Sequence, residues 1–372
     1  MTIAAGGSSS PVEVVLGVDT HLDFHVAVAL DQLGRKLGVI TVPTTKHGYE
    51  SLIRWAQQLG YVQRAGLEGT GSYGAGLARH LRAQGVEVLE VEPPKRRSRR
   101  KGKSDPIDAE AAARAVLAGE TASVAKSGDG RVEMIRLLKA ARRSAVKAKT
   151  QAANQLRAFR LTATEELGCR LSGLSTRALA AAALRFRPGD HPENAEEATR
   201  FAMRSVARRY RSLSEEIADL DAQLGRLVAE VAPGLTALCG VGTDNAATLL
   251  AMAGDNPERL GSEASFANLC GVAPIPASSG KVLRHRLSRG GNRDANRALH
   301  LICVVRMRTD ARTREYVARR TAEGKNRREI MRCLKRYIAR EIYGVLIPSV
   351  ARSSPEARGV SEARVAAMAD TT

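Results

Sequence analysis

The sequence predicts an N-terminal α/β domain, followed by a long helical or coiled-coil connector and a mostly α-helical C-terminal domain. Three β-rich runs come first, at residues 12–19, 25–30 and 36–42, and helical and β-rich stretches alternate after them. Long helical patterns then cover residues 131–160 and 196–231. The chain has 372 residues, of which 44% are hydrophobic, so it can form two or three domains with their own cores.

The N-terminal elements follow the order βββαβαβα. After the three strands, which we expect to be antiparallel, the pattern predicts a helix over 48–59, a strand over 65–68 and a helix over 73–84. A strand over 86–91 and a helix that begins at Asp105 complete the series. This order is that of the ribonuclease H-like nuclease fold.

Four acidic residues occupy positions where that fold carries its metal ligands. Asp19 lies at the first strand, Glu68 at the end of the fourth, and Asp105 and Asp108 on the last helix. Residues three apart on a helix face the same way. Clustered carboxylates suit Mg²⁺ or Mn²⁺, and two such ions can stabilise both the attacking and the leaving oxygen of a phosphoryl displacement. The sequence therefore predicts a divalent-metal site formed by these four residues.

The same helix start has a purely structural interpretation. Asp105 fits an N-cap, Pro106 the first helical position and Asp108 the capping-box position. Two histidines near the first acid, His21 and His25, could support metal ligands or be ordinary core or surface residues. The joint placement of the four acids in one topology favours the metal site.

A glycine motif offers a rival interpretation of this domain. Residues 69–74 read G-x-G-x-x-G after a strand, and Glu90 or Glu92 could then bind a ribose, as in dinucleotide-binding folds. Such a fold normally begins with this motif, whereas three strands precede it here. The nuclease-like fold is therefore the better prediction.

Composition points to nucleic acid as the partner. The chain has 58 Lys and Arg against 39 Asp and Glu, a formal net charge of +19, which attracts phosphate-bearing partners. Aromatic residues make up only 3%, which argues against binding of single strands by base stacking. The candidate contacts are Lys95, Arg96, Arg97, Arg99, Arg100, Lys101 and Lys103 before the Asp105 helix; Arg136, Lys139, Arg143 and Lys147 along the 131–160 helix; and Lys281, Arg284, Arg286, Arg289 and Arg293 further on.

The five cysteines are far apart and form no C-x-x-C motif, so we expect reduced thiols and no zinc site. The N-terminus lacks the pattern of a signal peptide, and no stretch is apolar enough for a membrane span. We therefore expect a cytoplasmic protein.

Two features beyond the first domain suggest further contacts. The helices over 131–160 and 196–231, separated by a break at 187–192, fit an antiparallel pair or an oligomerising coiled coil. Gly240 and Gly242 separate two short helical stretches, the pattern of a DNA-binding helix-hairpin-helix, although purely structural helix pairs contain similar glycine turns.

A polar loop near residue 280 carries a candidate nucleophile. Ser278, Ser279, Gly280 and Lys281 follow one another, with arginines beyond them. A hydroxyl in cationic surroundings can attack a phosphodiester. On physical grounds alone a polar turn explains the loop better.

These motifs together resemble the DEDD transposases of the IS110 family of insertion sequences. The resemblance covers residues 12 to 345: Leu-Glu-Gly-Thr-Gly-Ser-Tyr surrounds Glu68, Lys-Ser-Asp-Pro-Ile-Asp-Ala holds Asp105 and Asp108, and Leu-Cys-Gly-Val-Ala-Pro, Ser-Ser-Gly-Lys and Gly-Asn-Arg follow downstream. The resemblance implies a recombinase with a RuvC-like metal domain and a second catalytic domain whose serine forms a covalent phosphoserine link to DNA. Ser279, which precedes the glycine directly, matches that serine better than Ser278.

The resemblance also implies guidance by a structured RNA, double-stranded donor and target DNA as substrates, and a homo-oligomer, either a dimer or a tetramer. The expected organisation is a flexible N-terminus over 1–11, the metal domain over 12–125, the connector over 126–232, the serine domain over 233–350 and a disordered tail over 351–372. Two alternatives remain: a RuvC-like Holliday-junction or structure-specific endonuclease without a covalent intermediate, and a non-enzymatic nucleic-acid scaffold.

Overall fold

The computed structural model describes residues 13–91, 104–120, 124–277, 285–286, 288 and 290–353. The chain forms two compact units. Unit 1 contains the residues up to Asp129 and a later segment, Gly254–Gly261, whereas unit 2 contains Gly130–Ala253 and the residues from Ser262 onward.

Unit 1 is built on a five-stranded sheet with the order β3-β2-β1-β4-β5. The strands β1, β2 and β3 pair antiparallel, and β4 and β5 run parallel to their neighbours. The predicted ribonuclease H-like order is thereby confirmed, and the dinucleotide-binding alternative is wrong, because the glycine motif follows the fourth strand of a mixed sheet. The strands are β1 (Glu13–Thr20), β2 (Phe24–Asp31), β3 (Lys36–Pro43), β4 (Tyr61–Leu67) and β5 (Glu87–Glu90).

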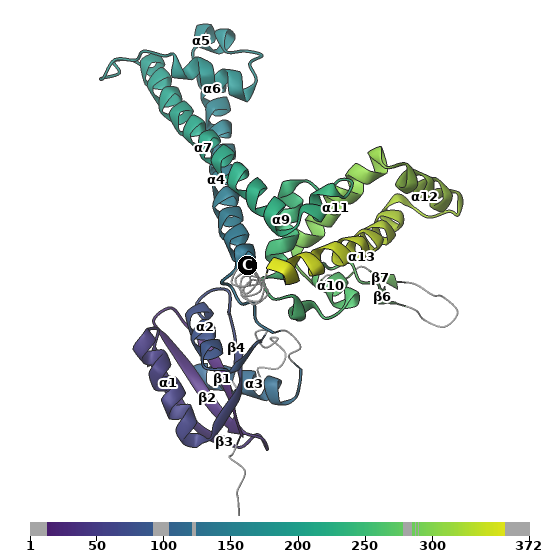
Figure 1. Ribbon diagram of the computed structural model, residues 1–372. Helices are drawn as coiled ribbons and strands as arrows, with labels where there is room; N and C mark the ends of the chain where they lie inside the picture. The colour runs from purple at the N-terminus through teal and green to yellow at the C-terminus, as the bar shows by residue number, and fades with distance from the viewer. Residues whose placement is uncertain are drawn as a thin grey trace, which may run out of the picture. The chain divides into compact units, whose positions relative to one another are not determined.

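Helices cover both faces of this sheet (Figure 1). Alternate residues of β1 point to opposite faces: Leu16 packs with α1 (Lys46–Leu59) and α2 (Ala75–Ala83), whereas Val15 packs with α3 (Asp105–Leu117). A Cβ added to Gly17 would lie 2.0 Å from the carbonyl oxygen of Ala109. Glycine at this position therefore allows α3 to lie directly on β1, which places the start of α3 near the end of that strand.

The segment Gly254–Gly261, far along the chain, completes unit 1. The Asn256 side chain donates a hydrogen bond to the carbonyl oxygen of Ala125 (3.2 Å) and accepts one from the amide of Ser127 (3.3 Å). Arg259 donates to the carbonyl oxygen of Val124 (3.1 Å) and lies 3.7 Å from the Glu90 carboxylate. Residues Pro257–Leu260 form a 3₁₀ helix, η2.

Two long antiparallel helices, α4 (Arg131–Thr162) and α7 (Ala195–Val231), form one arm of unit 2 (Figure 1). Arg131 pairs with Glu230 at 2.7 Å, and Arg142 pairs with Asp221, which fixes the antiparallel register. The predicted helices thus pack against each other within one chain. The short helices α5 (Glu165–Arg170) and α6 (Thr176–Leu184), which the sequence did not predict, connect them and share a buried core with both.

The rest of unit 2 is predominantly helical, as predicted. A two-stranded hairpin, β6-β7, interrupts the helices, and Phe266 packs fully buried beside the ring of Tyr343. No helix among the described residues has the length and apolarity needed to cross a membrane. The elements are α8 (Pro233–Ala237), α9 (Thr243–Ala253), α10 (Glu263–Leu269), β6 (Ile275–Pro276), β7 (His285–Arg286), α11 (Arg293–Thr309), α12 (Ala311–Ala322) and α13 (Arg327–Ser353).

Candidate metal centre and nucleic-acid contacts

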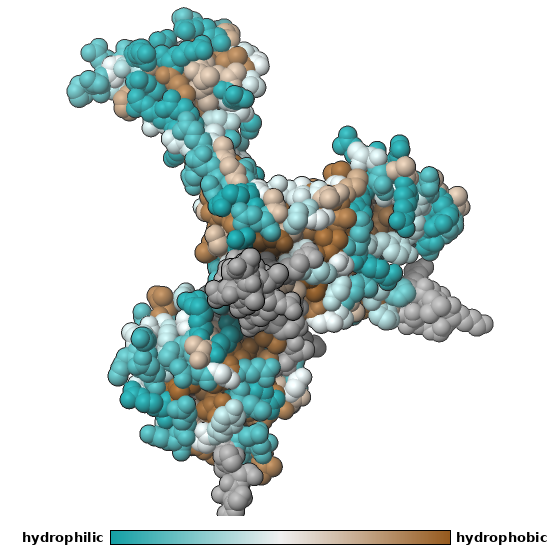
Figure 2. All heavy atoms as spheres, in the orientation of Figure 1, coloured by the Kyte–Doolittle hydropathy of each residue, from teal (hydrophilic) through white to brown (hydrophobic). Residues whose placement is uncertain are grey.

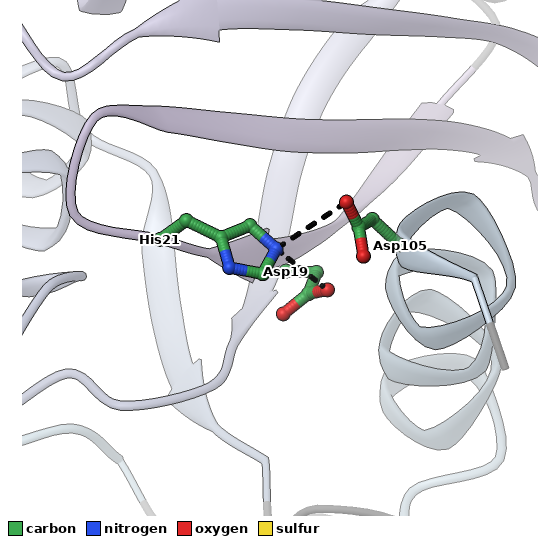
Figure 3. A group of neighbouring side chains, drawn as sticks. All are labelled: Asp19, His21 and Asp105. Atoms are coloured by element: carbon green, nitrogen blue, oxygen red, sulfur yellow. Dashed lines mark ion pairs between the residues drawn. The ribbon is translucent and has the colours of Figure 1, made fainter.

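The end of β1 and the start of α3 bring Asp19 and Asp105 together beside His21 (Figure 3). The His21 Nε2 atom lies 3.2 Å from Asp19 Oδ2 and 3.5 Å from Asp105 Oδ2. One ligand atom from each of the three side chains lies within 4.8 Å of the others. Two residues 86 positions apart in the sequence are therefore close enough to share one cation.

Asp19 lies in an environment that disfavours its charge. Burial raises the pKa of the Asp19 carboxyl, His21 acts in the opposite direction, and the negative charges of Asp105 and Asp108 raise it further. Asp108 is itself buried in the first turn of α3, so three of the four predicted acids influence one another. A divalent cation would relieve this repulsion, and the donor set of carboxylate oxygens with one imidazole nitrogen suits Mn²⁺, and Mg²⁺ where the oxygens dominate.

The fourth predicted acid, Glu68, follows β4 directly. Its amide donates a hydrogen bond to the carbonyl oxygen of Val18 (3.3 Å), and its own carbonyl oxygen accepts one from the Thr20 hydroxyl (2.9 Å). Gly17 and Gly66 are partners in the parallel register, and added Cβ atoms on both would meet α3. Asp19 lies two residues after Gly17 and so faces α3, since strand side chains alternate. Glu68 lies one residue beyond the end of β4 and outside the cluster of Asp19, His21 and Asp105.

The capping interpretation of the α3 start is wrong in detail. Ser104 occupies the N-cap, its side chain makes no capping hydrogen bond, and Asp105 is the first helical residue. Both Asp105 and Asp108 lie in the first turn, where the helix dipole favours negative charge. Their place in the first turn is compatible with metal binding.

The two histidines near Asp19 have different surroundings. His21 belongs to the acidic cluster and contacts the Phe24 ring, with the ring centroids 4.9 Å apart. His25 is fully buried and stacks on Tyr49 of α1, on the opposite sheet face. The roles of both histidines stayed open from the sequence alone, and the signal that was not used was the position of His21 two residues after Asp19, beyond the strand end.

Comparison with known families agrees with this geometry. Residues 16–163 match the family of DEDD transposases of the IS110 type, and residues 232–318 match the transposase family IS116/IS110/IS902. The two matches occur in the order that the motifs predicted and together cover more than half of the chain. The chain belongs to the IS110 family of transposases.

Two curated relatives support the assignment to the IS110 family. The insertion element IS110 uncharacterized 43.6 kDa protein of Streptomyces coelicolor is 32% identical over 145 residues, which is 38% of this chain and 36% of the relative. The insertion element IS900 uncharacterized 42 kDa protein of Mycobacterium paratuberculosis is 29% identical over 137 residues, 35% of this chain and 34% of the relative. The aligned part thus spans about a third of either relative.

The basic stripe predicted on α4 is largely paired with acids inside this IS110-family chain. Arg136 pairs with Glu133 at 2.6 Å, Lys139 with Asp244 of α9, and Arg143 with Asp294 of α11 at 3.1 Å. Lys147 lines a shallow cavity along the same helix. Contact between these four cations and nucleic acid remains a prediction, and the pairing reduces the charge that the first three offer.

The two glycines of the predicted helix-hairpin-helix lie between α8 and α9. Gly240 has a φ of +78°, and an added Cβ would lie 3.2 Å from the carbonyl oxygen of Ile302 in α11. The first turn of α9, after Gly242, holds Asp244, which pairs with Lys139 and Arg142. Packing explains Gly240, and phosphate binding at this turn stays a prediction.

Several predicted residues lie outside the described part of the structure. These are the basic residues between Lys95 and Lys103, both Ser278 and Ser279, and the cations Lys281, Arg284 and Arg289. Arg286 lies exposed on β7, and Arg293 begins α11. The described strands β6 and β7 flank the segment that contains the two serines.

Proposed function

We propose that this protein is the transposase of an insertion sequence and that it cleaves and rejoins DNA strands by phosphoryl transfer. The observation that carries the proposal is the convergence of Asp19 and Asp105 at one sheet edge, with Asp108 close enough to affect the pKa of Asp19, in a chain of the IS110 family. This convergence supports the proposal that Asp19, Asp105 and Asp108 belong to one carboxylate site, to which Glu68 is assigned by its position after β4.

The acidic residues have different roles in the proposed metal site. Asp19 and Asp105 would hold a Mg²⁺ or Mn²⁺ ion through their carboxylate oxygens, and Asp108 and Glu68 would add negative charge to the site. When bound, the ion stabilises the negative charge that develops on a phosphoryl oxygen. The His21 imidazole, within 3.5 Å of both carboxylates, orients them or acts as a further ligand.

The second part of the proposal assigns the nucleophile. The Ser279 oxygen attacks the phosphorus, a bond from Ser279 Oγ to phosphorus forms, and the bond from phosphorus to the sugar oxygen breaks. The serine proton is lost and the leaving oxygen gains one, so the step needs no external energy source. Reversal with a different strand end rejoins the DNA. The role of Ser279 rests on its match to the family serine, as do guidance by a structured RNA and assembly into a dimer or tetramer.

The decisive test compares two adjacent serines. Full-length protein with Mg²⁺ is incubated with labelled duplex DNA that carries the joined ends of the element, together with the RNA from its flank, and covalent protein–DNA adducts are measured on a denaturing gel. We expect Ser279→Ala to abolish the adduct because it removes the attacking oxygen, while Ser278→Ala retains it.

Circular dichroism and DNA binding of both variants control for folding. An undiminished adduct in Ser279→Ala would refute the nucleophile assignment. Cleavage by the wild-type protein without any adduct would favour the structure-specific endonuclease, in which water attacks. Absence of metal-dependent cleavage and of strand joining on this substrate would favour the non-enzymatic scaffold.

A further inference from the structure

A cationic cavity of about 760 Å³ lies in unit 2 beside the β6-β7 hairpin. Its lining combines the segment that enters the hairpin, residues 271–274, with β7 and one side of α13. Among the described residues that line it, six carry a positive charge and one, Glu329, a negative charge. The cations are Arg286, Arg320, Lys325, Arg332, Lys335 and Arg336.

Lys335 is the buried member of this group. Its side chain lies on α13 with an exposed fraction of 8%, and its ammonium donates a hydrogen bond to Asn296 Oδ1 at 2.9 Å. Within the described part of the chain, no carboxylate lies within ion-pair distance of Lys335, and burial lowers its pKa. An ammonium has three donors, and burying one without a counter-charge is unfavourable. An anion in the cavity would supply that counter-charge.

The partner of Lys335 is held in a fixed orientation. The Asn296 amide nitrogen donates to the carbonyl oxygens of Cys270 (2.9 Å) and Gly271 (3.0 Å). Because both of these groups are acceptors, the amide oxygen must face Lys335. The ammonium is therefore positioned against the segment that leads into β6, before any ligand arrives.

Two glycines allow the two ends of the hairpin to pack closely beside this cavity. Gly271 has a φ of +63° and Gly291 a φ of +86°, and an added Cβ on either would lie 2.6 Å from backbone atoms of the other end. The Asn292 amide also donates to the carbonyl oxygen of Leu269. The cavity thus adjoins the base of the hairpin whose two strands flank Ser278 and Ser279.

The other lining groups indicate what kind of anion fits. Arg336 pairs with Glu263 and Arg320 with Glu323, which leaves Arg286, Lys325 and Arg332 as the exposed cations at the rim. The Tyr337 ring, 53% exposed, also lines the cavity and is held edge-on by Tyr316. Figure 2 shows a mostly hydrophilic surface over the neighbouring α12. The volume exceeds that of a lone phosphate ion, and an aromatic face can contact a sugar or base.

We propose that this cavity binds a phosphodiester of a nucleic-acid strand, with Lys335 as the buried ligand and Arg286 and Arg332 as ligands at the rim. This inference rests on the proposed function, because it adds a substrate-holding site next to the hairpin that flanks the nucleophile. DNA and guide RNA present the same backbone phosphate, so the ligand is defined here by that shared group.

The test removes the buried charge while keeping the shape of the side chain. Affinities of the full-length Lys335→Met variant are measured by fluorescence anisotropy in EDTA for a labelled 20-nucleotide duplex DNA and for an RNA of the same sequence. We expect at least one of the two nucleic acids to bind about tenfold more weakly. For that nucleic acid, the slope of log affinity against log salt concentration should decrease in magnitude by about one. The matched control, Arg328→Gln, removes an exposed charge of the same helix outside the cavity and should change the affinity by less than about twofold.

The remaining outcomes separate charge from packing. Lys335→Arg keeps a cation and should retain most of the affinity, while the melting temperature of Lys335→Met should stay equal or rise, since a buried unpaired charge is removed. If Lys335→Met loses affinity for only the DNA or only the RNA, that nucleic acid is the ligand. Unchanged affinity of Lys335→Met in both arms, or an equal loss with methionine and arginine, would overturn the proposal. Neither result affects the serine adduct test, whose failure would in turn refute the proposed function alone.

Discussion

The acidic centre at β1 and α3 and the cationic cavity at α13 show the same arrangement with opposite sign. Each site gathers side chains of like charge, and each has one buried member, Asp19 or Lys335. A side chain that does not carry a fixed opposite charge contacts that member: His21 contacts Asp19, and Asn296 contacts Lys335. The α4 stripe differs from both, because acids within the chain pair with most of its cations. We therefore expect charge that stays uncompensated inside the fold to indicate a binding site better than charge counted along a helix.

The largest expected effect is a loss of strand cleavage on substitution in the acidic centre at β1 and α3. Asp19→Asn should reduce metal-dependent strand cleavage by about 10²- to 10³-fold, because it removes a carboxylate oxygen proposed to hold the cation. In EDTA its melting temperature should not fall, since the repulsion from Asp105 and Asp108 is relieved. The rise in melting temperature on adding Mg²⁺ or Mn²⁺ should be smaller than in the wild type.

Asp23→Asn is the matched control for that measurement. Asp23 is exposed in the turn after β1 and lies outside the cluster, so its variant should cleave and respond to metal like the wild type. Equal cleavage by the Asp19 and Asp23 variants would remove the metal role assigned to Asp19.

A second prediction tests whether the close packing of α3 on β1 creates the acidic centre. Gly17→Ala should destabilise the protein by about 3 kcal/mol and reduce cleavage, because its methyl group would overlap backbone atoms of α3 and displace Asp105. Chemical denaturation measures the free energy of unfolding.

Gly225→Ala is the control for the glycine-to-alanine change itself. Nothing lies within 4 Å of an added Cβ at Gly225 in α7, so the variant should gain about 0.5–1 kcal/mol from helix propensity. Wild-type stability of Gly17→Ala would contradict the packing that positions α3.

The smallest effect sharpens the contrast between paired and unpaired cations on α4. Lys147→Gln should weaken duplex DNA binding by about two- to threefold with a lower salt slope, as expected for one lost phosphate contact. Lys139→Gln should alter binding less and instead cost about 0.5–1 kcal/mol of stability through the lost pair with Asp244. Filter binding at several salt concentrations and thermal melts measure both quantities. A larger loss of DNA affinity in Lys139→Gln than in Lys147→Gln would show that Lys139 contacts nucleic acid despite its pair with Asp244.

Local patterns in the sequence were sufficient to predict the α/β unit. A β-rich run predicted β1 and alternation predicted β2. Asp19 and Asp105 could be placed together because the order of elements fixes which strand ends meet α3. The long helices α4 and α7 were predictable for the same reason, since the periodic signal for each lies within its own sequence.

Features that depend on distant partners could not be predicted in this way. The pairing of Lys139 with Asp244 joins residues 105 positions apart, and no local pattern encodes it. The contact of His21 with Asp105 also joins distant residues, 84 positions apart. The environment of Lys335 likewise depends on Asn296 of another helix.

The segment Gly254–Gly261 belongs to unit 1 but follows the long helical arm in the chain, so unit 1 cannot form all of its contacts until this segment has been synthesised. The contacts that Arg259 and Asn256 make with residues 124–127 form only after α4, α7 and α9 have been translated. A ribosome that stops within the long helical arm therefore releases a chain whose acid-bearing unit still lacks its final segment. Full maturation of that unit is tied to translation of the chain through Gly261.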